Sequence, residues 1–138
     1  MIAVVILNWN GAEMLRRFLP SVVEHSHPLG EVIVADNGST DNSLEILQQE
    51  FPEVRTLVLD RNYGFAEGYN EAFRRLEIIA PQRYEYYLLL NSDVRVTADW
   101  LRPLHTYMEQ HPEVAAAQPK LRAEWAHDTL EYAGAAGG

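Results

Sequence analysis

Two carboxylates, Asp36 and Asp93, each stand at the end of an apolar run: Asp36 directly follows positions 32–35, and Asp93 follows positions 87–90 after Asn91 and Ser92. A short apolar run that ends in Asp, Asn, Gly or Ser is typical of a buried parallel strand that gives way to a loop. In an open α/β sheet, ligands bind in the crevice beyond the carboxyl ends of such strands. Two acidic residues at that edge therefore indicate a site for a metal, a base or a polyphosphate.

Each carboxylate also has a purely structural interpretation. Asp36 can accept a hydrogen bond from an N–H group such as the imide of a pyrimidine base, or it can cap the turn through Asn37 and Gly38. Asp93, in Asn91-Ser92-Asp93, is the kind of oxygen ligand that Mg²⁺ or Mn²⁺ uses together with substrate phosphates and water. It can equally be an ordinary loop residue, so the spacing leaves both alternatives open.

Glycine and aromatic residues add further candidates for a binding site. Gly64 stands where a helix is expected to begin, and a helix N-terminus favours a phosphate. Gly68 lies inside that helix at a cost of about 1 kcal/mol relative to alanine, which indicates close packing against the sheet or a ligand. Trp9 follows the first apolar run and could stack on a nucleobase, although a core or rim position is the simpler interpretation.

These residues need a framework, and the apolar periodicity predicts alternating strands and helices. Strands separated by helical patterns imply a parallel sheet with right-handed crossovers. We expect Pro20 to end or kink the first helix and Thr97 to be the N-cap of the last one. The expected strands cover residues 2–8, 31–36, 55–59, 85–90 and 114–118, and the helices cover 11–24, a segment after the turn at 37–42, 65–80 and a segment after Thr97.

Composition narrows the class of protein. The 138 residues fit one domain, and the net charge of −9 argues against a nucleic-acid partner, which would need a basic stripe. The absence of cysteine excludes disulfides, thiolate catalysis and zinc-thiolate sites. No apolar run approaches the roughly 18–20 residues of a membrane span, so we expect no transmembrane segment and a cytoplasmic protein.

Four ordered motifs together resemble one family. They are Val4-Val5-Ile6-Leu7-Asn8-Trp9-Asn10-Gly11, Val34-Ala35-Asp36-Asn37-Gly38-Ser39-Thr40-Asp41, Asn62-Tyr63-Gly64-Phe65-Ala66-Glu67-Gly68-Tyr69-Asn70 and Leu89-Leu90-Asn91-Ser92-Asp93. Their order and spacing resemble the N-terminal half of a family 2 glycosyltransferase with the GT-A fold, over nearly the whole chain. The resemblance implies a Rossmann-like, mostly parallel α/β sheet flanked by helices, with the acceptor-binding half absent from this chain.

The resemblance also implies roles for single residues. Asp36 would accept the imide N–H of uracil or thymine, with Trp9 beside the base and Asn8 and Asn91 at neighbouring strand ends. Gly64 and Asn70 would shape the donor pocket. Asp93 would hold Mn²⁺ or Mg²⁺ against the diphosphate of a nucleoside-diphosphate sugar, and the sugar would pass with inversion to a saccharide or lipid-linked acceptor in polysaccharide biosynthesis. We also expect the protein to contact a membrane surface and to self-associate through exposed apolar surface.

Two departures from the family pattern matter. The metal motif reads Asn91-Ser92-Asp93, so an amide replaces its first carboxylate and metal affinity is expected to be weaker. This variant resembles the rhamnosyltransferase-like branch, which implies a thymidine-diphosphate sugar such as dTDP-rhamnose. The general base of the family lies in the missing half, and we leave it unassigned, because nothing selects Glu124, Asp128 or Glu131 for that role.

Two other classes of function remain open from the sequence. A receiver domain of a response regulator has a similar length and alternation, and Asp60 would be its phosphoacceptor. However, Asn8 and Asn10 stand where that domain needs acidic residues, and the Gly64 segment has no place in it. The third alternative is a nucleotide-binding fragment without activity.

Overall fold

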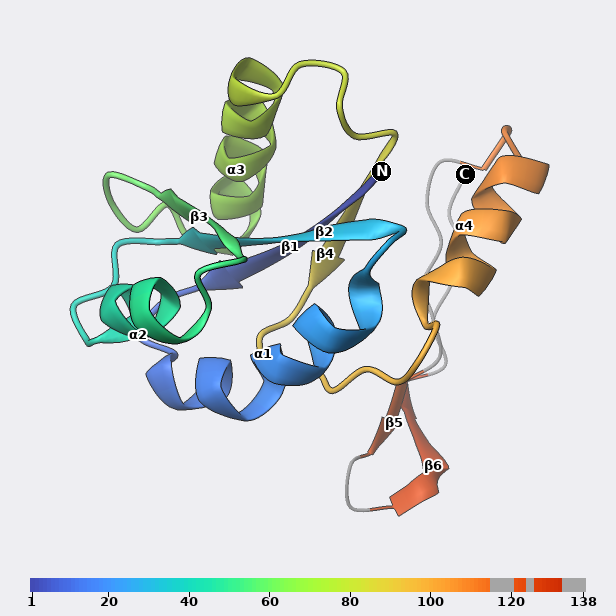
Figure 1. Cartoon of the computed structure of the whole chain (residues 1–138), viewed down its shortest axis with the longest axis horizontal. Helices are drawn as coiled ribbons and strands as arrows, with labels where there is room; N and C mark the ends of the chain where they lie inside the picture. Colours follow the sequence, from blue (N-terminus) through green and yellow to red (C-terminus); the bar gives the residue numbers. More distant parts are fainter. Residues whose placement is uncertain (115–120, 124–125, 133–138) are drawn as a thin grey trace. The chain divides into compact units, whose positions relative to one another are not determined.

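The apolar runs of the sequence form a four-stranded parallel sheet in the computed structural model, with the strand order β3-β2-β1-β4 (Figure 1). The structure describes residues 1–114, 121–123 and 126–132, and the chain divides into two compact units, Met1–Ala98 and Asp99–Gly138. The first unit holds the sheet and three helices. Its elements are β1 (Ile2–Asn8), α1 (Ala12–Ser26), β2 (Gly30–Asp36), α2 (Ser43–Glu50), β3 (Arg55–Val58), α3 (Phe65–Ile79) and β4 (Tyr86–Leu90).

Helices cover both faces of this sheet, which explains why β1 is apolar almost throughout. Successive residues of a strand point to opposite faces. One face packs against α3, and the other is covered by α1 and α2 (Figure 1). The cluster under α3 consists of Ala3, Val5, Ile33, Ala35, Leu57, Leu59, Tyr69, Ala72, Leu76 and Tyr84.

The strand order places a topological switch point between β1 and β4. From β1 the chain moves outward to β2 and β3 on one side and then returns to place β4 on the other side of β1. The register pairs Asn8 with Asp36 and Ile6 with Leu90, so the carboxyl ends of these strands lie at one edge. Ligands of open α/β sheets bind in the crevice at such a point.

Helix α1 does not end at Pro20 but continues to Ser26. A proline removes one helical hydrogen bond and tends to break a helix. Here Pro20 is exposed, whereas Leu19 and Val22 on either side of it are each 1% exposed. Burial of this apolar face anchors the helix on both sides of the proline. Of the two predicted effects of Pro20, the end of the helix was wrong, and a kink stays a prediction.

The second unit contains α4 (Leu101–Gln110) and an antiparallel pair, β5 (Leu121–Ala123) and β6 (Ala126–Tyr132). The prediction of Thr97 as N-cap was wrong, because Asp99 has a φ of 59° and the helix begins only at Leu101. Val114 lies in a turn, where its N–H donates to His111 O at 2.9 Å. The remainder of the strand expected at 114–118 lies outside the described residues. The hairpin was not predicted.

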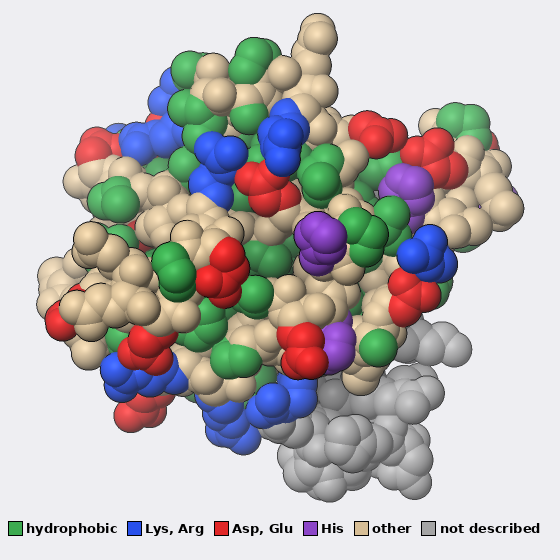
Figure 2. All heavy atoms as spheres, in the orientation of Figure 1, with side chains coloured by type: hydrophobic (Ala, Val, Ile, Leu, Met, Phe, Trp, Pro, Cys, Tyr) green, Lys and Arg blue, Asp and Glu red, His purple; other side chains and the backbone are tan. Residues whose placement is uncertain are grey.

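Acidic and basic side chains are interspersed over the face shown in Figure 2. Among the described residues, no helix is both long enough and apolar enough to cross a membrane. Within the described part of the chain, β4 lies at one edge of the four-stranded sheet, and Leu89 on it is 52% exposed. Ile78 and Ile79 at the end of α3 are also exposed.

Candidate functional site

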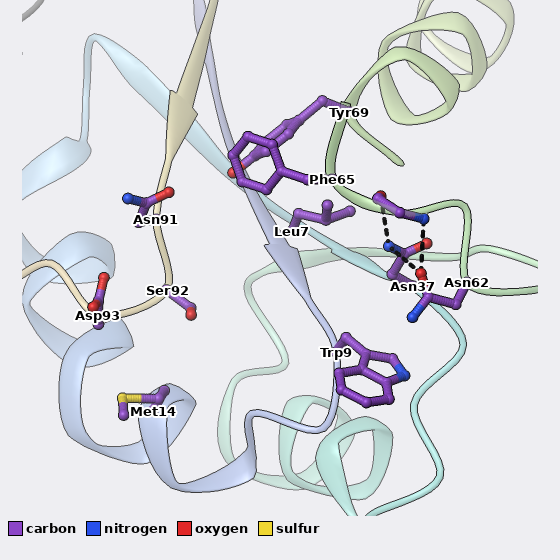
Figure 3. A pocket seen from close by; sticks show the side chains of 11 residues that line it. Leu7, Trp9, Met14, Asn37, Asn62, Phe65, Tyr69, Asn91, Ser92 and Asp93 are labelled. Carbon is purple, nitrogen blue, oxygen red and sulfur yellow. Dashed lines mark hydrogen bonds between the residues drawn. The ribbon is translucent and has the colours of Figure 1, made fainter. Parts of the chain in front are cut away.

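A cavity of about 500 Å³ opens at the carboxyl ends of β1 and β4, at the switch point of the sheet (Figure 3). Four segments of the first unit supply its walls: the end of β1 with the start of α1, the end of β2, the loop that leads into α3, and the loop after β4. The lining residues are Leu7, Trp9, Met14, Asn37, Asn62, Gly64, Phe65, Tyr69, Asn91, Ser92 and Asp93.

Trp9 and the loop after β4 form separate walls of this cavity (Figure 3). Trp9 is 56% exposed, so its indole is not a core side chain and its face is free for an aromatic ligand. Asn91 and Asp93 are also exposed. An aromatic wall and a carboxylate wall on one cavity suit a ligand with a planar ring and an anionic group bound through a cation.

Asp93 has the chemistry that a hard cation needs. Mg²⁺ and Mn²⁺ prefer oxygen ligands and commonly take one or two carboxylates, with phosphate and water oxygens completing the shell. Asp93 supplies one exposed carboxylate, and the amide of Asn91 on the same loop can add a carbonyl oxygen. The residues present therefore fit a cation that shares its ligands with a bound phosphate.

Asp36 and Asn8 do not line the cavity; each is only 1% exposed. Asn8 Nδ2 donates to Asp36 Oδ1 at 3.0 Å and to Ser39 Oγ at 3.3 Å. Ser39 N donates to Asp36 Oδ2 at 3.0 Å, so the turn-capping interpretation of Asp36 is confirmed. Recognition of a nucleobase by Asp36 stays a prediction. It would require a ligand to reach a buried carboxylate whose two oxygens already accept hydrogen bonds from the protein.

The loops after β1 and β2 are tied to each other by asparagine and serine. Asn10 adopts the left-handed conformation with a φ of 49°, which asparagine tolerates better than most residues. Its Oδ1 accepts hydrogen bonds from Thr40 N at 2.7 Å and Asp41 N at 3.2 Å, and its N–H donates to Ser39 Oγ at 2.9 Å. The segment that presents Trp9 is therefore fixed on the neighbouring strand.

Gly64 lies at the N-cap of α3 with a φ of 81° and lines the cavity, so the expected helix start is confirmed and its part in a donor pocket stays a prediction. Asn70 is exposed on α3 and is not among the lining residues, so the structure does not bring it to the cavity. Gly68 packs against the sheet, because a Cβ there would lie 2.8 Å from Leu7 Cδ2 and 3.1 Å from Asn37 Nδ2. The close packing inferred for Gly68 is thereby confirmed.

Several lining residues were not singled out as site residues from the sequence. Phe65 is 66% exposed at the start of α3 and makes an edge contact with Tyr69, their ring centroids 5.2 Å apart. Burial raises the pKa of Tyr69, whose hydroxyl donates to Leu90 O at 3.1 Å. Leu7 completes this apolar wall (Figure 3). The odd run of glycine and aromatic residues at 63–69 was the available signal for Phe65 and Tyr69.

The fold and the cavity define an α/β protein with a ligand site at the switch point of an open parallel sheet. The sequence model of glycosyl transferase family 2 matches residues 3–133, and the chain belongs to this family. Its sheet has the GT-A architecture. A receiver domain would instead place β1 between β2 and β3, so the strand order speaks against that alternative.

Two relatives in sequence illustrate the range of the family. The chain is 27% identical, over 86% of its length, to an N-acetylglucosaminyl-diphospho-decaprenol L-rhamnosyltransferase of Mycobacterium tuberculosis and covers 40% of that protein. It is 35% identical over 75 residues to an uncharacterized glycosyltransferase of Nostoc sp., with 52% of this chain and 23% of that protein covered. The chain thus spans less than half the length of these relatives.

Solved structures share the fold. The mannosyltransferase PcManGT of Pyrobaculum calidifontis, in complex with GDP-Man and Mn²⁺, superposes with a TM-score of 0.70 at 19% identity and covers 88% of this chain and 35% of its own. The S. aureus protein TarS 1-349, in complex with UDP-GlcNAc, gives a TM-score of 0.65 at 22% identity, with 80% and 32% covered. At these identities the likeness shows the fold alone.

Proposed function

We propose that this chain is the donor-binding part of an inverting glycosyltransferase that uses a nucleoside-diphosphate sugar. The observation that carries the proposal is the cavity at the switch point, where exposed Trp9 and the Asn91–Asp93 loop form walls of one space. The proposed donor is a UDP- or dTDP-sugar, and dTDP-rhamnose is the specific candidate suggested by the relative from Mycobacterium tuberculosis. The acceptor would be a saccharide or a lipid-linked saccharide, in polysaccharide biosynthesis on the cytoplasmic side of the cell.

Different residues of the chain would bind different parts of the donor. Trp9 would present its indole face to the base, and Asp93, with Asn91, would hold Mn²⁺ or Mg²⁺ beside the diphosphate. When bound, the cation would neutralise charge on the leaving nucleoside diphosphate. The chain's own contribution is to hold the donor in one orientation, because positioning of the reacting groups supplies much of the rate of such a displacement.

Calorimetry with UDP and dTDP, each with and without Mn²⁺, tests the proposal. We expect the metal to raise nucleotide affinity roughly tenfold or more, the value of one contact to a charged group. Asp93→Ala should remove this enhancement and leave the fold intact, because the exposed loop carboxylate contributes little to the core. Glu45→Ala, an exposed change on α2 away from the cavity, is the control and should keep the enhancement.

Two results would contradict the proposal in different ways. If no nucleoside diphosphate binds, the assignment of the cavity to a nucleotide is wrong. If nucleotides bind and the metal enhancement persists in Asp93→Ala, the cation is held elsewhere.

A further inference from the structure

The loop after β4, which carries the candidate metal ligands, is held at two points. It begins at Leu90, which pairs with Ile6 in the sheet. Further along the loop, Val96 is 8% exposed, and its backbone N–H donates a hydrogen bond to Ser21 Oγ at 3.1 Å. Residues 91–95 therefore lie between one anchor on the sheet and another on helix α1.

The hydroxyl group of Ser21 makes two hydrogen bonds that fix its role. A backbone N–H can only donate, so Ser21 Oγ is the acceptor in the contact with Val96. The O–H of Ser21 in turn donates to Phe18 O at 3.1 Å, within α1. A serine inside a helix often bonds to a carbonyl of the preceding turn in this way. The bond to Phe18 directs the hydrogen into the helix and leaves the oxygen as an acceptor for the loop.

A second contact joins the same loop to the same helix. The guanidinium carbon of Arg95 lies 5.4 Å from the centroid of the Phe18 ring. Phe18 is only 6% exposed, so its ring is held in the core while it contacts the cation. The segment that follows Asp93 is thus joined to α1 through a backbone hydrogen bond and a ring contact.

Helix α1 also supplies part of the cavity wall. Met14, one turn before Phe18, lines the cavity together with Asp93 (Figure 3). Ser21 itself is not a lining residue. It can therefore affect a ligand only through the loop that it holds.

We infer that Ser21 is a positioning residue for the candidate cation site, because it holds the backbone of Val96 and thereby keeps Asn91 and Asp93 at the cavity. The inference rests on the proposed nucleotide-sugar function and extends it to a residue outside the cavity. It assigns to Ser21 no contact with donor or cation. Its effect should appear only in binding that depends on the metal.

The expected size of this effect follows from the length of the loop. With the hydrogen bond in place, the segment between the two anchors is 91–95. Without it, the chain has neither helix nor strand until α4 begins at Leu101, so the loose segment becomes about twice as long. Doubling the length of a flexible loop makes any one geometry of its ends about threefold less probable. We therefore expect the contribution of the metal to nucleotide affinity to fall about threefold.

Two substitutions of nearly the same shape isolate the hydroxyl group. Ser21→Val removes it, and Ser21→Thr keeps it while adding a branch at Cβ. Calorimetry of UDP with and without Mn²⁺ gives the gain in affinity due to the metal in each protein. We expect the gain to be about threefold smaller in Ser21→Val than in the parent and to be retained in Ser21→Thr. UDP affinity without metal should be the same in all three proteins, since Ser21 does not line the cavity.

Hydrogen exchange at the Val96 amide checks the contact without any ligand. This N–H is hydrogen-bonded in the parent, and Ser21→Val removes its partner. We expect the amide to exchange about fivefold faster or more in Ser21→Val, the effect of one lost hydrogen bond, and at the parent's rate in Ser21→Thr. Unchanged protection of Val4 and Val5 in β1 would show that the sheet of the variant is intact.

Three results would overturn the inference. The first is a metal-dependent gain in Ser21→Val equal to that of the parent, since the loop would then hold its ligands without Ser21. The second is equally slow exchange of the Val96 amide in both proteins. The third is a loss of UDP affinity in Ser21→Val that is as large without metal as with it, because a general loss of structure would then explain the effect.

Failure of the proposed function gives a different pattern. If the parent binds no UDP, or gains nothing from Mn²⁺, the assignment of the cavity fails and this inference fails with it. That result is seen in the parent alone. Failure of the inference by itself is seen only in the comparison of Ser21→Val with the parent and with Ser21→Thr.

Discussion

Replacing Gly68 by alanine has two opposed effects on stability, a better helix propensity and a steric clash. The structure predicts that the clash is the larger effect. A Cβ at position 68 would lie 2.8 Å from Leu7 Cδ2, 2.9 Å from Leu7 Cδ1 and 3.1 Å from Asn37 Nδ2. The Asn37 amide makes three hydrogen bonds, which a shift of its side chain would break. Leu7 must therefore give way, and it lines the cavity, so we expect its side chain to shift toward the ligand site.

The expected magnitude follows from the two opposed effects. Alanine in place of glycine inside a helix gains about 1 kcal/mol. Forcing extra carbon into a packed region costs about 1–3 kcal/mol. We therefore expect Gly68→Ala to lower the free energy of unfolding by up to about 2 kcal/mol, despite the better helix former.

A double-mutant cycle with Leu7→Ala measures the contact directly. Urea unfolding of the parent, both single variants and the pair should show that Leu7→Ala costs about 1 kcal/mol less in the Gly68→Ala background, since the clash is then relieved. UDP affinity should fall in Gly68→Ala and recover in the pair. If Gly68→Ala stabilises the protein by about 1 kcal/mol and the cycle is additive, the close approach to Leu7 is not what requires glycine.

Three further predictions concern the backbone, the pH dependence and the buried carboxylate. Gly64→Ala should lower the free energy of unfolding by about 1–3 kcal/mol in urea, because a φ of 81° strains any residue with a Cβ although the space is open; an unchanged value would show that the backbone relaxes. Burial acts to raise the pKa of Glu31, but hydrogen bonds from Arg55, Arg83 and Tyr84 outweigh the effect of burial, so the pKa of Glu31 is lowered. Its stabilising effect should therefore be present above pH of about 4.5 and be lost as the pH falls through the lowered pKa, so unfolding curves of the parent and Glu31→Gln should differ at pH 7 and converge in acid. Asp36→Asn should cost about 1–3 kcal/mol in thermal or urea unfolding even without ligand, because both carboxylate oxygens accept hydrogen bonds in the protein; equal stability of the two proteins would contradict this.

The four strands of the parallel sheet were predicted almost to the residue, because burial on both faces of this sheet makes each strand a continuous apolar run. Strand β1 covers Ile2–Asn8 as expected, and α3 begins at Phe65 as expected. Errors arose where local signals competed with packing or backbone conformation. Helix α1 continues past Pro20 because its apolar face is buried on both sides of the proline. Thr97 is not the N-cap of α4 because Asp99, with a φ of 59°, lies outside the helical conformation.

The candidate site was less predictable, because its geometry depends on atoms rather than on residue types. Trp9, Gly64 and Asp93 were identified from strand ends and glycine, and they do line one cavity. Nothing in the spacing shows that Asp36 is covered by its own turn. Equally, the orientation of the Asn62 amide depends on the N–H of Gly64, a contact that exists only once the loop has its final path.

The pairing of β1 with β4 also has a kinetic consequence. It pairs Ile2 with Tyr86, so β1 can complete its pairing only after β4, which follows three helices in the sequence, has docked beside it. Contacts between residues so distant in sequence close late and slow the formation of a native sheet. Trp9 follows β1 and Asp93 follows β4, so the cavity has both of its walls only when these two strands are paired. A fluorescent nucleotide added during refolding should therefore report the docking of β4 rather than the earlier formation of helices. The ligand would then stabilise only the completed sheet, shifting the equilibrium by mass action toward chains in which the last strand is in place.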